Sequence, residues 1–286
     1  MPSVGQIARR IRSVENTAKI TKAMSMIAAS KLRRTQEAAT QGRSYADNMS
    51  KIVSNVMVQS QGDEDIQPLA EARQISNVGL VLITSDRGLT GGLNSNVLRA
   101  AGDFIGRQSV PVKVVAMGKK GLDYSRRNSL HVIGEFTGIS DRPTPGDSIP
   151  ASDAIIESFN RLEIDSVHIA FAEFVNTTVQ RPSVNQLVPV LPRNVSDTSN
   201  IGYIFEPDAG TVLSELLPRY VQTLIHHALL EANASEQSAR MVAMNQATDN
   251  ANAMVGDLTL LMNKLRQETI TKELLDIVGG VAAIEG

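Results

Sequence analysis

The 286-residue chain contains no cysteine and no tryptophan, and aromatic residues make up only 3% of it. The lack of cysteine excludes disulfides, cysteine-ligated zinc or iron–sulfur clusters, and thiol catalysis. Because the chain also has 10 Met, its core must consist of aliphatic and small side chains. This composition favours helix packing over a β-sandwich.

Histidine is scarce too, with four in the whole chain. His226 and His227 are adjacent on a predicted helix, where neighbouring side chains point about 100° apart and cannot easily bind one ion. We therefore predict no metal site and no cofactor.

Long apolar runs are missing as well. No run approaches the roughly 18 residues of a membrane span, and the start MPSVGQIARR lacks the apolar core of a signal peptide. We expect a cytosolic chain unless a partner holds it elsewhere.

Proline is scarce at both ends: of the 11 prolines, all except Pro2 lie from Pro68 to Pro218. Both ends are therefore free to be helical. Near the N-terminus, apolar residues recur every three or four positions, which predicts a heptad seam; they are Val4, Ile7, Ile11, Val14 and Ala18, and later Met49, Val53 and Val56. Ser3 is expected to cap this helix, and the polar run 60–65 to end it.

The C-terminal segment repeats this spacing in two places, listed as Leu213, Leu217, Tyr220 and Leu224, then Ala251, Met254, Leu258, Leu261 and Leu265. Between them, residues 232–256 are rich in Ala, Asn and Ser, which lets two helix backbones approach closely. Pro218 is expected at a kink or a late helix start. Gly279 and Gly280 are expected to stop the helix.

Helices over residues 3–58 and 209–278 would be roughly 80 Å and 105 Å long, too long to lie inside one domain. One enters the central region and the other leaves it, so helices that project together must run antiparallel. We predict an antiparallel coiled coil whose C-terminal helix outruns its partner by roughly 20 Å and ends as a single helix.

The centre alternates between strand and helix patterns, which predicts an open, mainly parallel sheet. The predicted strands are 78–84, 112–117, 131–136, 167–174 and 184–191, the predicted helices are 96–105, 122–126 and 152–162, and 138–150 is a predicted loop.

The segment SDRGLTGGLNSN, residues 85–96, follows a predicted strand and opens a helix, where phosphate-binding loops lie. Its glycines fit neither a Walker loop nor a dinucleotide loop. We interpret it as a tight glycine turn, with Ser95 or Asn96 capping the next helix. No Ser/His/Asp triad can be assembled from the sequence with any preference.

The N-terminal helix carries a positive charge although the whole chain is at −2. Residues 1–43 contain nine Lys and Arg against Glu15 and Glu37, a net of +7. Within residues 20–32 the apolar residues cover more surface than one seam needs. One face should therefore meet the partner helix and another an acidic partner outside the chain, although a solvated basic face is the alternative.

Three segments together resemble one known family, the gamma subunit of bacterial F-type ATP synthases. They are IRSVENTAKITKAMSMIAASKLRRTQ, ITSDRGLTGGLNSN and the closing residues 235–286. The resemblance covers essentially the whole chain. It implies a noncatalytic rotor shaft that couples ion flow through the membrane c-ring to ATP synthesis or hydrolysis in the ring of alpha and beta subunits.

The resemblance also implies contacts, which we carry over by position. Lys19, Lys22 and Met24 match the segment near an acidic lever of the beta subunit, and Arg266 and Gln267 match a second beta contact. Tyr203 and Glu206 match the c-ring contact. The tail 277–284 would turn in an apolar sleeve. The implied partners are the alpha, beta and epsilon subunits and the c-ring, with membrane contact only through that ring, at the cytoplasmic face of a bacterial membrane.

The predicted fold is thus α/β, with a long antiparallel coiled coil of N- and C-terminal helices flanking a Rossmann-like open sheet domain. Its expected parts are residues 1–67, 68–208 and 209–286. Two rival hypotheses remain: a nucleotide-binding α/β enzyme with helical arms, and a basic coiled coil that binds nucleic acid. The second has little support because the basic helix lacks aromatic stacking residues.

Overall fold

The structure is a computed structural model that describes residues 3–59, 67–192, 206 and 208–285. By internal contacts the chain forms two compact units, one of residues 1–27 and 241–286 and the other of residues 28–240. Helices α1 (Val4–Gln59) and α5 (Ala209–Glu285) are each continuous through both units. The division into 1–67, 68–208 and 209–286 stays a prediction, because it follows sequence segments whereas these units group residues by contact.

The unit of residues 28–240 contains a five-stranded sheet in the order β3-β2-β1-β4-β5. Strands β1, β2, β3 and β4 run parallel, and β5 is an antiparallel edge strand next to β4. The elements between the long helices are η1 (Pro68–Ala70), β1 (Val78–Ile83), α2 (Leu93–Arg107), β2 (Val112–Met117), α3 (Lys119–Arg127), β3 (His131–Phe136), α4 (Pro145–Asn160), β4 (Ser166–Phe174) and β5 (Gln180–Val188). The predicted open, mainly parallel sheet is confirmed.

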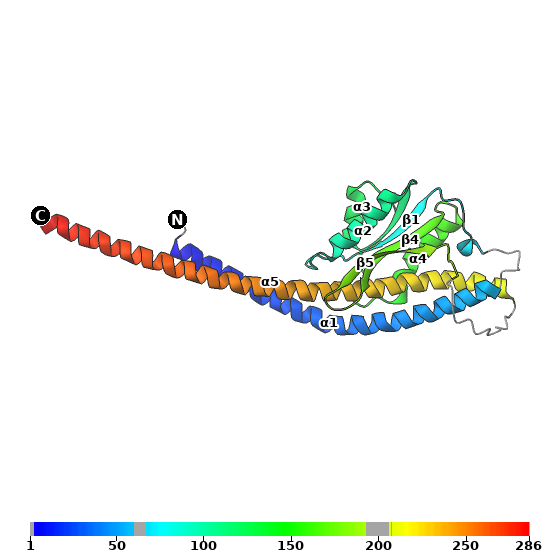
Figure 1. Ribbon diagram of the computed structural model, residues 1–286, viewed down its shortest axis with the longest axis horizontal. Coiled ribbons are helices and arrows are strands. Elements are labelled where there is room, and N and C mark those ends of the chain that lie inside the picture. The colour runs from blue at the N-terminus through cyan, green and yellow to red at the C-terminus, as the bar shows by residue number, and fades with distance from the viewer. Residues whose placement is uncertain (1–2, 60–66, 193–205, 207, 286) are drawn as a thin grey trace. The chain divides into compact units, whose positions relative to one another are not determined.

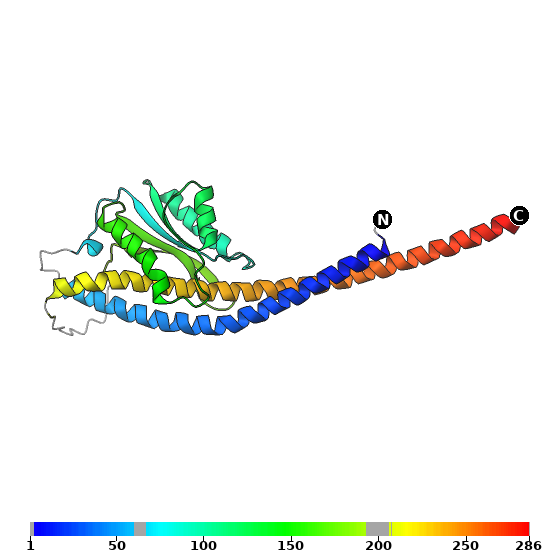
Figure 2. The same ribbon diagram turned by 180° about the vertical axis from the view of Figure 1, so that it is seen from behind.

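Alternate residues of the central strands enter two different cores, as the two-residue period of a strand requires. Leu80 and Leu82 pack with helices α2 and α3, whereas Val81 and Ile83 pack with α4 and with parts of α1 and α5. Figures 1 and 2 show these helices on opposite faces of the sheet. Because both faces are covered, β1 is buried at all six positions.

In the other unit α1 and α5 lie side by side and run antiparallel (Figures 1 and 2). Ile7 and Ile11 of α1 pack against Leu258 of α5, flanked by Val14, Val255, Met262 and Leu265. Farther along, the hydroxyl oxygens of Thr21 and Thr248 lie 2.7 Å apart in a hydrogen bond. As residue numbers rise along α1, from Ile7 to Thr21, those of the contacting residues on α5 fall, from Leu258 to Thr248. This confirms the predicted antiparallel pair.

The buried stripe of α1 keeps heptad spacing beyond the apolar residues that predicted it. Alternating steps of four and three connect buried or half-buried residues, namely 7, 11, 14, 18, 21, 25, 28, 32, 35, 39, 42, 46, 49 and 53. Between 18 and 46 all of these except Leu32 are Thr, Ser, Ala or Gly. Small side chains therefore let the α1 backbone approach what it packs against closely.

Ser3 caps α1 as expected. Its hydroxyl oxygen accepts the Gln6 N–H at 3.3 Å, and Gln6 Oε1 accepts the Ser3 N–H at 2.9 Å. This reciprocal pair is a capping box. The helix ends at Gln59, and residues 60–65, which were expected to end it, lie outside the described residues.

Several predicted boundaries are wrong. The segment 145–150 is helix rather than loop, because Thr144 and Asp147 form a capping box and Pro145 occupies the first turn, where its missing N–H costs nothing. Strand β5 begins at Gln180, four residues earlier than predicted. Pro218 lies inside α5, so of its two expected places the late helix start is wrong and the kink stays a prediction.

Gly279 and Gly280 do not stop α5, which continues to Glu285. A glycine in an exposed helix interior costs about 1 kcal/mol relative to Ala, which weakens a helix without ending it. The expected stop was therefore wrong.

The close approach of the α1 backbone predicts different costs at two adjacent alanines. Ala28 is 1% exposed and Ala29 is exposed, so Ala28→Leu should lower the free energy of unfolding by about 1–3 kcal/mol. The matched control Ala29→Leu should change it by less than about 0.5 kcal/mol. Urea unfolding of the two variants measures the difference, and equal effects would contradict the small-residue seam.

Candidate functional site

The residues predicted to contact an acidic partner lie on an exposed face of α1. Lys19 and Lys22 are exposed, and Met24 is half-buried. Apolar side chains share this surface, since Ile20, Met26 and Ile27 are each more than half exposed. The spacing of 19, 20, 22, 26 and 27 brings these residues to neighbouring turns of the helix.

The opposite side of this stretch of α1 is used for packing. Thr21, Ser25, Ala28 and Leu32 are buried in the heptad stripe. The sequence showed more apolar residues in 20–32 than one seam needs. Of these, Ile20 and Ile27 are exposed, whereas Ala28 and Leu32 are buried in the stripe. Large exposed apolar side chains next to lysines are typical of an interaction surface.

Arg266 and Gln267 begin a second exposed surface on α5. The apolar cluster with α1 ends at Leu265, and every side chain from Arg266 to Gly280 is exposed. This stretch, which we call the bare segment of α5, includes five exposed large apolar residues: Ile270, Leu274, Leu275, Ile277 and Val278. Among the described residues, the apolar cluster of its own unit includes none of these side chains.

The structure does not bring the two predicted beta contacts together. Lys22 lies close to the level of Thr248, because Thr21 bonds that residue. Arg266 is 18 residues farther along α5, a separation of roughly 27 Å along the helix axis. The candidate surfaces are thus two separate positions along one helix pair.

Of the predicted c-ring contacts, Tyr203 lies outside the described residues and Glu206 is exposed. Glu206 precedes the start of α5, which Asp208 caps by accepting the Thr211 N–H at 2.7 Å and the Thr211 hydroxyl at 2.8 Å. The bond from the Thr211 N–H holds the pKa of Asp208 below its ordinary value. The start of α5 next to Glu206 is therefore fixed by its own cap.

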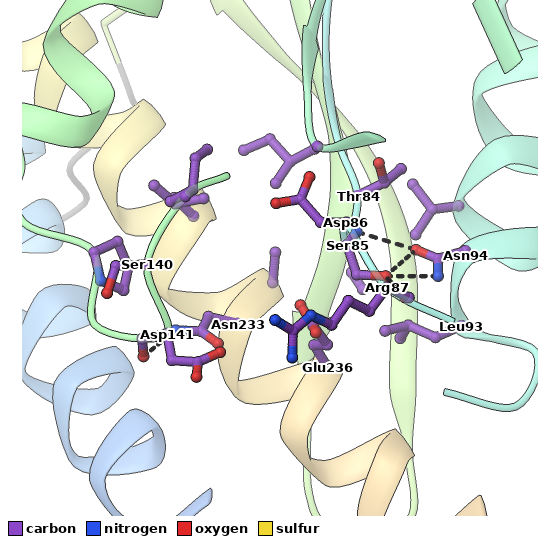
Figure 3. A pocket seen from close by; sticks show the side chains of 18 of the residues that line it. Thr84, Ser85, Asp86, Arg87, Leu93, Asn94, Ser140, Asp141, Asn233 and Glu236 are labelled. Carbon is purple, nitrogen blue, oxygen red and sulfur yellow. Dashed lines mark hydrogen bonds between the residues drawn. The ribbon is translucent and has the colours of Figure 1, made fainter. Parts of the chain in front are cut away.

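A cavity of about 360 Å³ lies at the carboxyl ends of the parallel strands, where open α/β sheets bind ligands. Figure 3 shows Asp86, Arg87, Asp141 and Glu236 around it. Burial raises the pKa of Glu236, and the neighbouring Arg240, whose Nη2 lies 2.6 Å from the carboxylate, opposes that shift. The cavity is therefore lined by charged groups of both signs.

Two backbone donors beside this cavity are already occupied. Asp86 Oδ1 accepts the N–H of Lys119, the first residue of α3, and Asp86 Oδ2 accepts the N–H of Gly138, both at 2.8 Å. A bound phosphate would need such donors at a helix N-terminus, and here the carboxylate of Asp86 uses them. The chain turns at residues 91–92 within the segment 85–96, as the sequence indicated, and Asp86 bonds this segment to α3 and to Gly138.

The detail of that turn differs from the prediction. Neither Ser95 nor Asn96 caps α2, which begins at Leu93 after the cap residue Gly92. Instead Asn94 reaches back, and its Oδ1 accepts the Ser85 N–H at 3.1 Å (Figure 3). Sequence reasoning missed Asp86 and Asn94, although an Asp in the turn that follows a buried strand is a recognisable signal for a side chain that bonds backbone N–H groups.

The histidines give no metal site among the described residues, where no group of three candidate ligands occurs. Burial lowers the pKa of both His226 and His227. Both side chains are therefore held toward the neutral form by the core around them.

A family model described as ATP synthase matches residues 3–284. A protein of Dehalococcoides mccartyi named ATP synthase gamma chain is 48% identical over 284 residues, covering 99% of this chain and 100% of the relative. A protein of the same name from Chloroflexus aurantiacus is 44% identical over 288 residues, with 99% of each chain covered.

Two solved structures share the fold. A chain of the Euglena gracilis mitochondrial ATP synthase, in an assembly of OSCP, F1 and c-ring, aligns with a TM-score of 0.67 at 19% identity, covering 98% of this chain and 94% of that one. A chain of the Tetrahymena thermophila mitochondrial central stalk and c-ring aligns with a TM-score of 0.60 at 24% identity, covering 80% of this chain and 99% of that one.

The clamp formed by Asp86 predicts a stability effect. Asp86→Ala leaves the Lys119 and Gly138 N–H groups without their acceptor, so the free energy of unfolding should fall by about 0.5–2 kcal/mol, as for a lost helix cap. Asp103→Ala, at an exposed aspartate of α2, serves as the control and should change it by less than about 0.5 kcal/mol. Thermal unfolding of both variants measures this, and an unchanged Asp86→Ala variant would show that water replaces the carboxylate without cost.

Proposed function

The chain belongs to the ATP synthase family, with curated relatives named gamma chain, and on that premise we propose that it is the central rotor shaft of a bacterial F-type ATP synthase. In this function it couples ion flow through the membrane c-ring to ATP synthesis or hydrolysis in the alpha and beta subunits. It contributes no catalytic residue of its own.

The bare segment of α5 is the observation that carries this proposal. Fifteen consecutive helical positions, 266–280, are exposed after the packing with α1 ends. A free helix with large apolar side chains on its surface would be unfavourable in water. A surrounding apolar sleeve of alpha and beta subunits would cover it without fixing one orientation, because apolar contact is non-directional.

The proposed beta contacts follow from the exposed basic face of α1 and from the start of the bare segment. Lys19, Lys22 and Met24 would face an acidic lever of the beta subunit, where long flexible lysine stems can exchange carboxylate partners as the shaft turns. Arg266 and Gln267 would meet a second beta loop farther along α5.

The c-ring and the epsilon subunit complete the proposed set of partners. Glu206 is exposed beside the start of α5, which supports its assignment to the c-ring contact, and Tyr203 is assigned with it by position alone. Among the described residues no helix is long and apolar enough to span a membrane. We place the chain at the cytoplasmic face of the bacterial membrane, held there through the c-ring.

Reconstitution tests the proposal. The intact chain mixed with alpha and beta subunits should assemble with them and give rotation during ATP hydrolysis, whereas a chain lacking residues 264–286 should still associate in part but transmit less torque, because it has lost the bare segment. Rotation of a bead attached to the chain measures both. If the isolated chain hydrolysed ATP or bound a nucleotide with micromolar affinity, the rival enzyme hypothesis would replace this one.

Charge reversal at Lys22 tests the acidic beta contact. Because an exposed ion pair contributes about 0.2–1 kcal/mol, Lys22→Ala should lower coupled ATP synthesis by less than about fivefold. Lys22→Glu should lower it further, since it adds repulsion against the acidic partner. Lys51→Glu, at an exposed lysine of the same helix, is the control; if it had the same effect as Lys22→Glu, the assignment of a local contact would be wrong.

A further inference from the structure

A buried carboxylate joins three elements within the unit of residues 28–240. Glu231 of α5 is only 1% exposed. Its Oε1 accepts hydrogen bonds from Nε of Arg43, at 3.1 Å, and from Nη2 of the same guanidinium. Its Oε2 accepts the N–H of Phe174, the last residue of β4, at 2.8 Å. Both oxygens of the buried acid are therefore used.

A further hydrogen bond connects Arg43 directly to β4. Nη2 of Arg43 also donates to the carbonyl oxygen of Phe174, at 3.3 Å. Helix α1 thus bonds both α5 and β4, and α5 bonds β4, through Arg43, Glu231 and the Phe174 backbone. We call these three residues the clasp.

The charges around the clasp favour the positively charged form of Arg43. The hydrogen bond to Glu231 raises the pKa of Arg43 above its ordinary value, and Glu173 and Asp47 add to this effect. His227 also lies next to Glu231, with its Nε2 3.5 Å from Glu231 Oε1. Burial lowers the pKa of His227, so Arg43 supplies the positive charge. Removing it would leave an uncompensated buried carboxylate.

The clasp attaches α1 to the sheet at a point away from the apolar core. Val53 and Val56 of α1 are in the apolar core that covers one sheet face. Arg43 lies ten residues before Val53, roughly 15 Å along the helix. A helix held at one point can pivot, whereas a helix held at two separated points has a fixed direction relative to the sheet.

Helix α5 is fastened to the same end of β4 and to the turn that follows. The hydroxyl of Ser235 donates to the Ala172 carbonyl at 2.9 Å, and the hydroxyl of Ser238 donates to the Thr177 carbonyl. The clasp thus adds α1 to a junction that already holds α5. Twisting the helix pair against the sheet would have to stretch these directional bonds, which weaken steeply when misaligned.

We propose that Arg43 and Glu231 are positioning residues that make the joint between the sheet and the two long helices torsionally stiff. This proposal rests on the proposed rotor function: torque enters at the sheet-containing unit and leaves through α1 and α5, which continue into the other unit. A stiff joint passes that torque on without a lag in angle. The residues touch no substrate and act only through the path of the force.

The test measures the stiffness directly in the complex with alpha and beta subunits. The chain has no cysteine, so Arg127→Cys, at the exposed end of α3, offers one site for a bead. The complex is arrested with nucleotide and the angular fluctuation of the bead is recorded. The variants are Arg43→Ala and the milder Glu231→Gln, which keeps an acceptor for the Phe174 N–H. The control is Arg33→Ala with Glu37→Ala, an exposed ion pair within α1.

Both clasp variants should widen the angular variance, by about twofold or more for Arg43→Ala because α1 loses an attachment to the sheet and the buried carboxylate of Glu231 loses its cation, while ATP hydrolysis by the complex stays unchanged. The control should show neither effect. Unchanged variance would overturn the proposal, and so would a loss of hydrolysis in parallel with the variance, because that pattern indicates general unfolding. Failure of the unmodified chain to assemble or rotate would instead refute the proposed function.

Discussion

The packing of α1 against α5 is the constraint on which the arrangement depends. The two ends of the chain are far apart in sequence, yet Ile7 and Leu258 share one cluster and Thr21 bonds Thr248. The heptad stripe of α1 continues from position 7 to position 53, so one periodic pattern serves an apolar seam, a small-residue seam and the sheet core in turn. Residues outside this stripe remain exposed, and the proposed partner contacts are among them.

The helices and strands could be predicted because each is encoded in a local period. The absence of proline marked the long ends, and alternation marked the strands. Boundaries that depend on a single cap were harder to predict. The capping box of Thr144 and Asp147 makes a proline-containing segment the first turn of α4, and the composition of that segment does not indicate a helix. The end of the C-terminal helix was predicted wrongly from Gly279 and Gly280. A glycine weakens a helix locally without ending it, and α5 continues through both.

The candidate site was predictable to a lesser degree. Exposure of Lys19, Lys22, Arg266 and Gln267 follows from the helical period, but their partners are other chains and stay proposals. The clasp could not be predicted, because Arg43 and Glu231 are 188 residues apart and Phe174 takes part only through its backbone. Long-range polar contacts of this kind carry no local period, so only the folded arrangement reveals them.

The bare segment of α5 also has a consequence for how cells must produce this protein. A helix that exposes Leu274, Leu275, Ile277 and Val278 is a surface on which unassembled copies can self-associate. On the proposed function, synthesis in excess of the subunits that would cover this segment would favour aggregates over a reserve of free protein. The same side chains would then tie the tolerable rate of synthesis of this chain to that of its proposed partners.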